Sequence, residues 1–275
     1  MPRIKVRDIE MYYEIRGEGH PLLLIHGFLA NLDCWDPLYM MPGLSENFKC
    51  ILFDNRGSGR TDYPKNPRED FTIKLMGDDA AALMDELGIE HAYVLGHSMG
   101  GMIAQEFALN HPEKVDKLIL ASTYCGGKES VPVPDSASAV IMDIAAALDE
   151  KGKWDHEIAG MLMPNVFTDE YMAENPGGVD IATELILTAP TCSEPLNEQV
   201  FSILSLDLCS RLHKIKAPTL IIAGRKDRFI PSENAEIMAK RIQGSKVMYL
   251  DKSGHMLMEE SDQATEAIIE FLSPT

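Results

Sequence analysis

Ser98 lies in a pattern that prepares a hydroxyl group for nucleophilic attack. Gly96-His97-Ser98-Met99-Gly100 fits G-x-S-x-G, with the apolar run Tyr93–Leu95 directly before it and a helical pattern over Met99–Leu109 directly after it. A serine on so tight a strand-to-helix turn is held in strained φ/ψ with its hydroxyl exposed above the sheet. The helix N-terminus also favours developing negative charge. The pattern predicts a serine nucleophile, with a chance match in a glycine-rich turn as the alternative.

A serine hydroxyl needs a neighbouring base, and His255 is the best placed histidine. Ser253-Gly254-His255 follows the predicted strand Val247–Leu250, at the end of a sheet strand. His97 is next to Ser98 but is expected to point away from it, and His26 begins a neighbouring loop. The other histidines lie in turns, at a helix end, at the opposite edge of the sheet or in the segment 126–206.

Asp227 is the predicted partner of this base. It follows the strand Thr219–Ala223, in a turn closed by Pro231. There it would accept a hydrogen bond from Nδ1–H of His255 and fix the tautomer of the ring. The order serine, aspartate, histidine is that of one hydrolase architecture rather than the two protease ones. Asp207 and Asp251 are the alternative acids, and a simple turn-forming role is the alternative for Asp227.

An acyl-transfer site also requires N–H donors for the oxyanion of the tetrahedral intermediate. The backbone N–H of Met99, directly after the nucleophile, is the first expected donor. The second is the N–H of Phe28 in His26-Gly27-Phe28, because Gly27 lets this loop approach closely after the third strand. The alternative is that His-Gly is an ordinary turn.

The elements around these residues alternate between short apolar strands and helical patterns. This alternation predicts an α/β fold with a mostly parallel central sheet flanked by helices, preceded by an antiparallel strand at Ile9–Arg16. Between residues 126 and 206 the alternation stops, and amphipathic runs replace it. We therefore expect a core of residues 1–125 and 207–275 with a helical cap of residues 126–206, although crossover helices of a larger sheet are the alternative.

The charge composition of the chain limits the classes of molecule that it is expected to bind. The chain has 275 residues, 43 acidic against 25 basic side chains and a formal net charge of −18. So acidic a surface repels nucleic acid and anionic lipid. The longest apolar runs are far shorter than a membrane span. We expect a small-molecule substrate, no nucleic acid and no membrane, and the choice between monomer and homodimer stays open.

The number and spacing of the cysteines argue against a disulfide framework and against a zinc site. They are odd in number and scattered, with no Cys-x-x-Cys pair: Cys34, Cys50, Cys125, Cys192 and Cys209. We expect no disulfide framework, no metal and no cofactor, and Cys125 as a small buried residue. With no signal-like N-terminus, this pattern favours the reducing cytoplasm.

Together these motifs resemble those of the α/β-hydrolase superfamily, in particular its lidded, cofactor-free serine hydrolases. The resemblance covers residues 9–125 and 207–272 and also includes Trp35 and Asp54-Asn55-Arg56-Gly57-Ser58-Gly59. It implies that the segment 54–59 braces the base of the site. Aspartate-nucleophile enzymes are disfavoured by Ser98. Carbon–carbon hydrolases are disfavoured by His97 and Met256, where that group typically has Asn and Trp.

The expected activity is that of a carboxylesterase on small or medium acyl esters, with an acyl-enzyme on Ser98 and water as acceptor. The alternatives are a cofactor-free haloperoxidase or perhydrolase, a lactonase, a carbon–carbon hydrolase and a ligand-binding receptor of the same fold. Large flexible or aromatic side chains are the candidate pocket residues: Trp35, Phe229, Met256, Met142, Met161 and Met163.

Overall fold

A single twisted sheet forms the centre of the computed structural model, which describes residues 2–36, 40–63, 71–188 and 193–273. Its order is β1-β2-β4-β3-β5-β6-β7-β8, with β1 and β2 antiparallel to their neighbours and the others parallel. The strands are β1 (Arg3–Val6), β2 (Ile9–Arg16), β3 (His20–Ile25), β4 (Phe48–Phe53), β5 (Ala92–His97), β6 (Val115–Ala121), β7 (Thr219–Gly224) and β8 (Lys246–Leu250).

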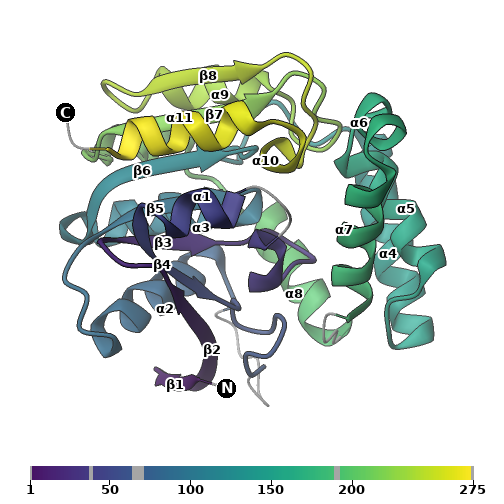
Figure 1. The fold of residues 1–275 in the computed structure, drawn as a ribbon, viewed down its shortest axis with the longest axis horizontal. Helices are drawn as coiled ribbons and strands as arrows, with labels where there is room; N and C mark the ends of the chain where they lie inside the picture. Colours follow the sequence, from purple (N-terminus) through teal and green to yellow (C-terminus); the bar gives the residue numbers. More distant parts are fainter. Residues whose placement is uncertain (1, 37–39, 64–70, 189–192, 274–275) are drawn as a thin grey trace.

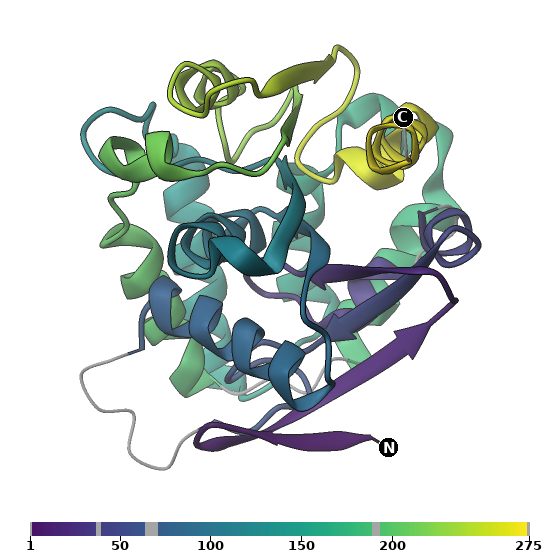
Figure 2. The same cartoon turned by 90° about the vertical axis from the view of Figure 1, so that its left-hand side faces the viewer.

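Helices cover both faces of the sheet (Figure 2). Successive side chains of a strand point to opposite faces. Leu23 and Ile25 of β3 therefore join one buried cluster, and Leu22 and Leu24 join the other. The first face is covered by α2 (Ile73–Glu86), α3 (Met99–Asn110) and α9 (Glu233–Ala239), and the second by α1 (Met40–Ser45) and α11 (Asp262–Leu272). The predicted fold class is confirmed.

Two details differ from the sequence-based expectation. The edge strand β1 and the short helix α1 were not predicted, because four to six residues carry too little periodicity. The helical pattern over residues 258–272 predicts one final helix, but it is divided into α10 (Leu257–Glu260) and α11, because Ser261 has an extended backbone (φ −155°, ψ 116°).

Among the described residues, five α-helices lie between β6 and β7, all within the segment predicted as a cap. They are α4 (Asp135–Lys151), α5 (His156–Val166), α6 (Asp169–Glu174), α7 (Pro176–Thr188) and α8 (Ser193–Leu204). Figure 1 shows α4 to α7 grouped beside the core. Ile144, Leu148 and Ile158 are buried in the same apolar cluster as α2 and α3. These helices are therefore packed onto the core by apolar burial.

A disulfide at the base of this insertion corrects the cysteine prediction. Cys125 follows β6, Cys209 begins the 3₁₀-helix η3 (Cys209–Lys214), and the two are bonded with their Cα atoms 5.0 Å apart. Leu208 N–H donates to the Cys125 carbonyl (2.8 Å), and Gly126 pairs with Asp207. The sequence separation of 84 residues hid this pair, because the two ends meet only when the insertion folds. The cysteines therefore no longer argue for a reducing compartment.

Breaking this disulfide is expected to lower stability. Closure of an 84-residue loop restricts the unfolded chain, which corresponds to an upper value of about 4–5 kcal/mol. Urea unfolding of the wild type with and without reductant should therefore give a lower midpoint in the reduced protein. Reductant should leave the midpoint of the Cys125→Ala/Cys209→Ala variant unchanged. Equal midpoints for oxidised and reduced wild type would contradict the expectation.

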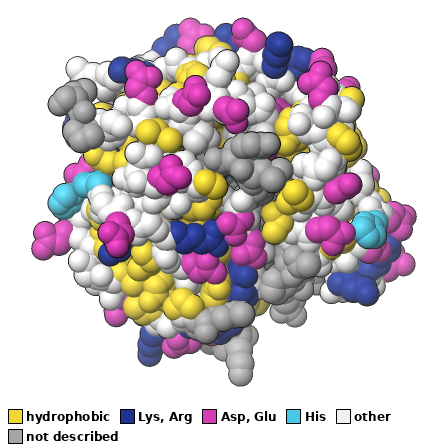
Figure 3. Space-filling view, viewed as in Figure 1, with side chains coloured by type: hydrophobic (Ala, Val, Ile, Leu, Met, Phe, Trp, Pro, Cys, Tyr) yellow, Lys and Arg dark blue, Asp and Glu magenta, His cyan; other side chains and the backbone are white. Residues whose placement is uncertain are grey.

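The surface agrees with the acidic composition. Asp and Glu side chains are spread over the face seen in Figure 3, interspersed with Lys and Arg. Within the part of the chain that the structure describes, no helix is long and apolar enough to cross a membrane.

Candidate active site

Ser98, His255 and Asp227 form a continuous hydrogen-bonded chain. His255 Nε2 lies 3.0 Å from Ser98 Oγ, and His255 Nδ1 lies 2.9 Å from Asp227 Oδ2. The other carboxylate oxygen, Oδ1, accepts the backbone N–H groups of Phe229 (2.8 Å) and Ile230 (2.9 Å). Because Asp227 is an acceptor on both oxygens, His255 donates from Nδ1 and presents its Nε2 lone pair to the serine hydroxyl. These are the three residues predicted as nucleophile, base and acid.

The turn that carries Ser98 is strained and closely packed. Ser98 has φ +55° and ψ −121° at the junction of β5 and α3. A methyl group on Gly100 would overlap the carbonyl oxygen of Ile25, so only glycine fits there. Backbone bonds hold the turn, with Ser98 N–H donating to Ala121 O (2.9 Å). The hydroxyl is therefore fixed where the parallel strands end.

His26 orients the loop that carries the predicted donor Phe28. Its Nε2 accepts the N–H of Asn55 (3.0 Å), so its Nδ1 carries the proton and donates to the Gly27 carbonyl (2.9 Å). Burial lowers the pKa of His26, which keeps the ring neutral. The Gly27 carbonyl and the Phe28 N–H belong to one planar peptide group and point in opposite directions. The Phe28 N–H therefore points away from His26, in a loop where a Cβ on Gly27 would lie 3.1 Å from Ser98 Cβ.

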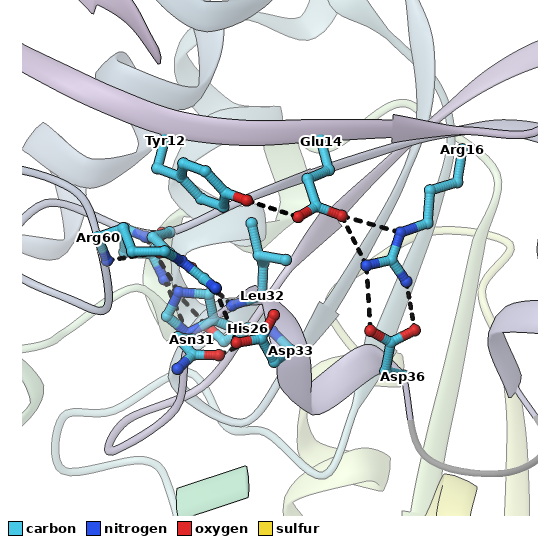
Figure 4. Close-up of polar contacts among 11 residues, drawn as sticks. Tyr12, Glu14, Arg16, His26, Asn31, Leu32, Asp33, Asp36 and Arg60 are labelled. Atoms are coloured by element: carbon cyan, nitrogen blue, oxygen red, sulfur yellow. Dashed lines mark hydrogen bonds and ion pairs between the residues drawn. The ribbon is translucent and has the colours of Figure 1, made fainter. Parts of the chain in front are cut away.

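A network of hydrogen bonds and ion pairs holds the segment that follows the Phe28 loop (Figure 4). Asp54 is fully buried and accepts the N–H groups of Leu32 (2.7 Å) and Arg60 (2.7 Å). Arg60 also pairs with Asp33 (2.9 Å). On β2, Arg16 links Glu14 (2.6 Å) to Asp36. These bonds anchor the 3₁₀-helix η1 (Leu32–Trp35) to β2 and to the loop after β4.

Ser98 and His255 open into a cavity of about 170 Å³ between the sheet edge and the insertion helices. Its wall is mostly apolar, and the side chains come from both the core and the insertion: Phe28, Leu29, Met102, Val133, Ile141, Leu162, Met163, Val166, Phe167, Ala182, Ile186, Ile203, Phe229, Ile230 and Met256. No Lys or Arg is among the described residues that line it. The cavity therefore suits an uncharged substrate.

Three of the six candidate pocket residues line this cavity, namely Phe229, Met163 and Met256. The other three are corrected. Trp35 is buried in the cluster under α1 and α11, on the other face of the sheet. Met142 is 61% exposed on α4, and Met161 packs against the core without lining the cavity. A thioether's position in the insertion did not reveal which side of its helix faces the core.

His97 was expected to point away from Ser98, and the hydrogen-bonded chain to Ser98 runs through His255 instead. The His97 side chain lines the cavity, and its Nε2 lies 2.9 Å from the backbone carbonyl of His255. Burial, and next the nearby His255, lowers the pKa of His97 to about 4, so the ring is neutral and donates from Nε2. His97 therefore supports the backbone of the loop that carries the base.

Two adjacent glutamates on α10, Glu259 and Glu260, follow His255 and were not among the predicted site residues. Glu260 accepts the N–H groups of Thr168 (2.6 Å) and Gly254, which ties the His255 loop to the insertion. Glu259 lines the cavity, and its Oε2 is buried without a hydrogen-bond partner. Burial raises the pKa of Glu259 to about 8, against the smaller, lowering effect of a hydrogen bond from its own backbone N–H, and the charge of Glu260 adds to the rise. Nothing in the sequence distinguished the position of Glu259 in the cavity from the structural role of Glu260.

The described residues that could together hold a metal ion do not line this cavity. Within the described residues, His20, His91 and Asp116 are close enough to share an ion, and they lie at the amino-terminal ends of β3, β5 and β6. Both histidines already contact Asp116 Oδ2, at 2.9 and 2.5 Å. The triad does not include them, and the expectation of no metal and no cofactor stays a prediction.

Several proteins that this chain resembles are named hydrolases. A family model described as alpha/beta hydrolase fold matches residues 20–152, and one described as TAP-like protein matches residues 205–274. A putative carbamate hydrolase of Azorhizobium caulinodans is 28% identical over 93% of this chain and 91% of its own. A 2-hydroxy-6-oxo-6-phenylhexa-2,4-dienoate hydrolase of Comamonas testosteroni is 25% identical over 96% and 92%.

Solved structures extend this likeness to the whole chain. The enol-lactonase of Burkholderia xenovorans has a TM-score of 0.85 with 26% identity over 99% of this chain and 100% of its own. A thermophilic esterase of Thermogutta terrifontis has a TM-score of 0.83 with 27% identity over 99% and 98%. The chain therefore has the α/β-hydrolase fold. At that level of description it is a hydrolase.

Proposed function

We propose that this hydrolase is a serine carboxylesterase that cleaves small to medium acyl esters through an acyl-enzyme on Ser98. The observation that supports it is the unbroken chain from Asp227 through His255 to Ser98, opening into an apolar cavity of about 170 Å³. Such a chain supplies an activated nucleophile, and the cavity offers apolar contact to an acyl group.

In the first half-reaction, Ser98 Oγ attacks the ester carbonyl while its proton moves to His255 Nε2. The buried carboxylate of Asp227 stabilises the imidazolium that forms. The N–H groups of Phe28 and Met99 hold the oxyanion of the tetrahedral intermediate. His255 then protonates the leaving alcohol, and the acyl group remains on Ser98.

In the second half-reaction, water takes the place of the alcohol. His255 removes a proton from water, the hydroxide adds to the acyl carbonyl, and the intermediate collapses with return of the proton to Ser98 Oγ. The products are the acid and the free enzyme. The same steps would deliver the acyl group to peroxide in a perhydrolase, so the acceptor has to be measured.

Carbamates are a second candidate substrate class, since a relative that matches most of the chain is named a putative carbamate hydrolase. A carbamate has a carbonyl that the same serine could attack. Dienoates and other carboxylate-bearing substrates are less favoured, because the described wall has no cation to pair with them.

The test is a substrate panel for the wild-type protein. It comprises p-nitrophenyl esters from acetate to decanoate, an N-alkyl carbamate, an enol lactone and a ring-cleavage dienoate, each with and without hydrogen peroxide. We expect the largest kcat/KM for short to medium acyl esters, with water as the acceptor.

Other outcomes would redirect the proposal. Faster turnover of the carbamate or the dienoate would replace the ester assignment with that bond class. Acyl transfer to peroxide faster than hydrolysis would indicate a perhydrolase. Tight ligand binding by thermal shift without turnover of any substrate would indicate a receptor-like role.

A further inference from the structure

Glu259 carries a buried, unpartnered carboxyl oxygen in the mostly apolar wall of the cavity. It lies on α10, four residues after the base His255, and lines the same cavity as Ser98. Its Oε2 is buried with no hydrogen-bond partner. A buried polar atom left unpaired is costly, so its presence calls for an explanation.

Two neighbouring polar side chains of the cavity each use one atom in a hydrogen bond within the protein. Asn31 Oδ1 accepts the N–H of Asp33 (2.7 Å), and His97 contacts the carbonyl of His255. Burial raises the pKa of the Cys34 thiol well above its ordinary value, so that thiol is neutral. Among the described residues that line the cavity, Glu259 therefore carries a buried oxygen, Oε2, with no hydrogen-bond partner.

The state of Glu259 determines what it can bind. With its pKa raised to about 8, the side chain is mainly a neutral carboxylic acid at pH 7. Such a group can donate one hydrogen bond and accept another, but it gives no attraction to a carboxylate. Ionisation above that pKa would add repulsion of an anion, and no Lys or Arg in the described wall offsets it.

We propose that Glu259 is the specificity residue of this site. It holds the amide, hydroxyl or carbonyl group of an otherwise apolar, uncharged substrate, and the cavity rejects substrates that end in a carboxylate. This inference rests on the proposed function, because it assumes that the substrate reaches from Ser98 into the same cavity. Glu260 provides the contrast, since its carboxylate is used by Thr168 and Gly254.

The test uses three p-nitrophenyl esters of equal chain length. One is the hexanoate, one ends in a primary amide in place of the terminal methyl group, and one is the half ester of adipic acid, which ends in a carboxylate. A second series of esters carries the same three end groups, methyl, primary amide and carboxylate, on the alcohol part instead of on the acyl chain. For the wild type we expect kcat/KM to be highest for the amide-tipped ester and lowest for the carboxylate-tipped one.

Two substitutions of Glu259 distinguish the effect of its hydrogen bond on specificity from the effect of its size and shape. Glu259→Gln keeps the shape and a hydrogen-bonding amide, so the ratio of amide-tipped to methyl-tipped kcat/KM should stay close to that of the wild type. Glu259→Met fills the space without hydrogen bonding, so the ratio should fall about 3- to 10-fold in one of the two series, the effect of one net hydrogen bond. Glu259→Met should also raise the melting temperature, whereas loss of a structural glutamate would lower it.

Glu266→Met, at an exposed glutamate on α11, is the matched control and should leave the ratio unchanged. If the esters are cleaved but the ratio is the same in wild type and Glu259→Met in both series, the inference fails while the proposed function stands. A carboxylate-tipped ester that is the best substrate would also overturn it. If no ester is cleaved, the proposed function fails. The dissociation constants of the same esters for Ser98→Ala and Ser98→Ala/Glu259→Met then decide the inference without turnover.

Discussion

Ser98→Ala is expected to lower kcat by about a million-fold for the best ester in the panel, the loss typical of a removed serine nucleophile. The methyl group cannot attack a carbonyl, and His255 is left without a proton to transfer. The turn should persist, because Ala121 and Thr123 hold it through the backbone N–H and carbonyl of Ser98. The measurement is steady-state hydrolysis by wild type and variant, prepared side by side.

An unchanged melting temperature is the control for this comparison. Activity of Ser98→Ala within a factor of ten of the wild type would contradict the nucleophile assignment.

Asp227→Asn is expected to lower kcat by about 10⁴-fold, as when such a histidine is held in the wrong tautomer. Oδ1 can still accept the N–H groups of Phe229 and Ile230 in the variant, so the new amide nitrogen faces His255 Nδ1. An N–H donor there forces Nδ1 to accept, and the proton moves to Nε2. His255 then has no lone pair for the Ser98 proton.

The control is Asp251→Asn, because Asp251 was the alternative acid and its side chain is 90% exposed. It should retain wild-type kcat. A loss of activity in Asp251→Asn rather than in Asp227→Asn would exchange the two roles.

The residues of the candidate triad could be predicted because strand ends are readable in a sequence. Ser98, Asp227 and His255 each follow a short apolar strand, β5, β7 and β8. Parallel strands place their carboxyl ends at one edge of the sheet, so residues far apart in sequence come together there. A glycine within three residues of each position, Gly96, Gly224 and Gly254, added the turn signal.

Features that depend on the insertion could not be predicted in the same way. The Cys125–Cys209 bond forms where the two ends of the insertion meet, and periodicity does not report such a meeting. Met163 lines the cavity while Met142 is exposed, because the docking of each helix decides which side faces inward. Glu259 was missed because only the packing of α10 in the folded protein shows that this residue lines the cavity.

The most direct test of the account is covalent labelling with a fluorophosphonate, which reacts with an activated serine and does not turn over. Wild-type protein is labelled, digested and analysed by mass spectrometry. For the wild type we expect one adduct, on the peptide that contains Ser98. We expect no adduct in the Ser98→Ala variant and much slower labelling of the Asp227→Asn variant. A label on another residue, or equal labelling of Ser98→Ala, would contradict the claim that Ser98 is the nucleophile.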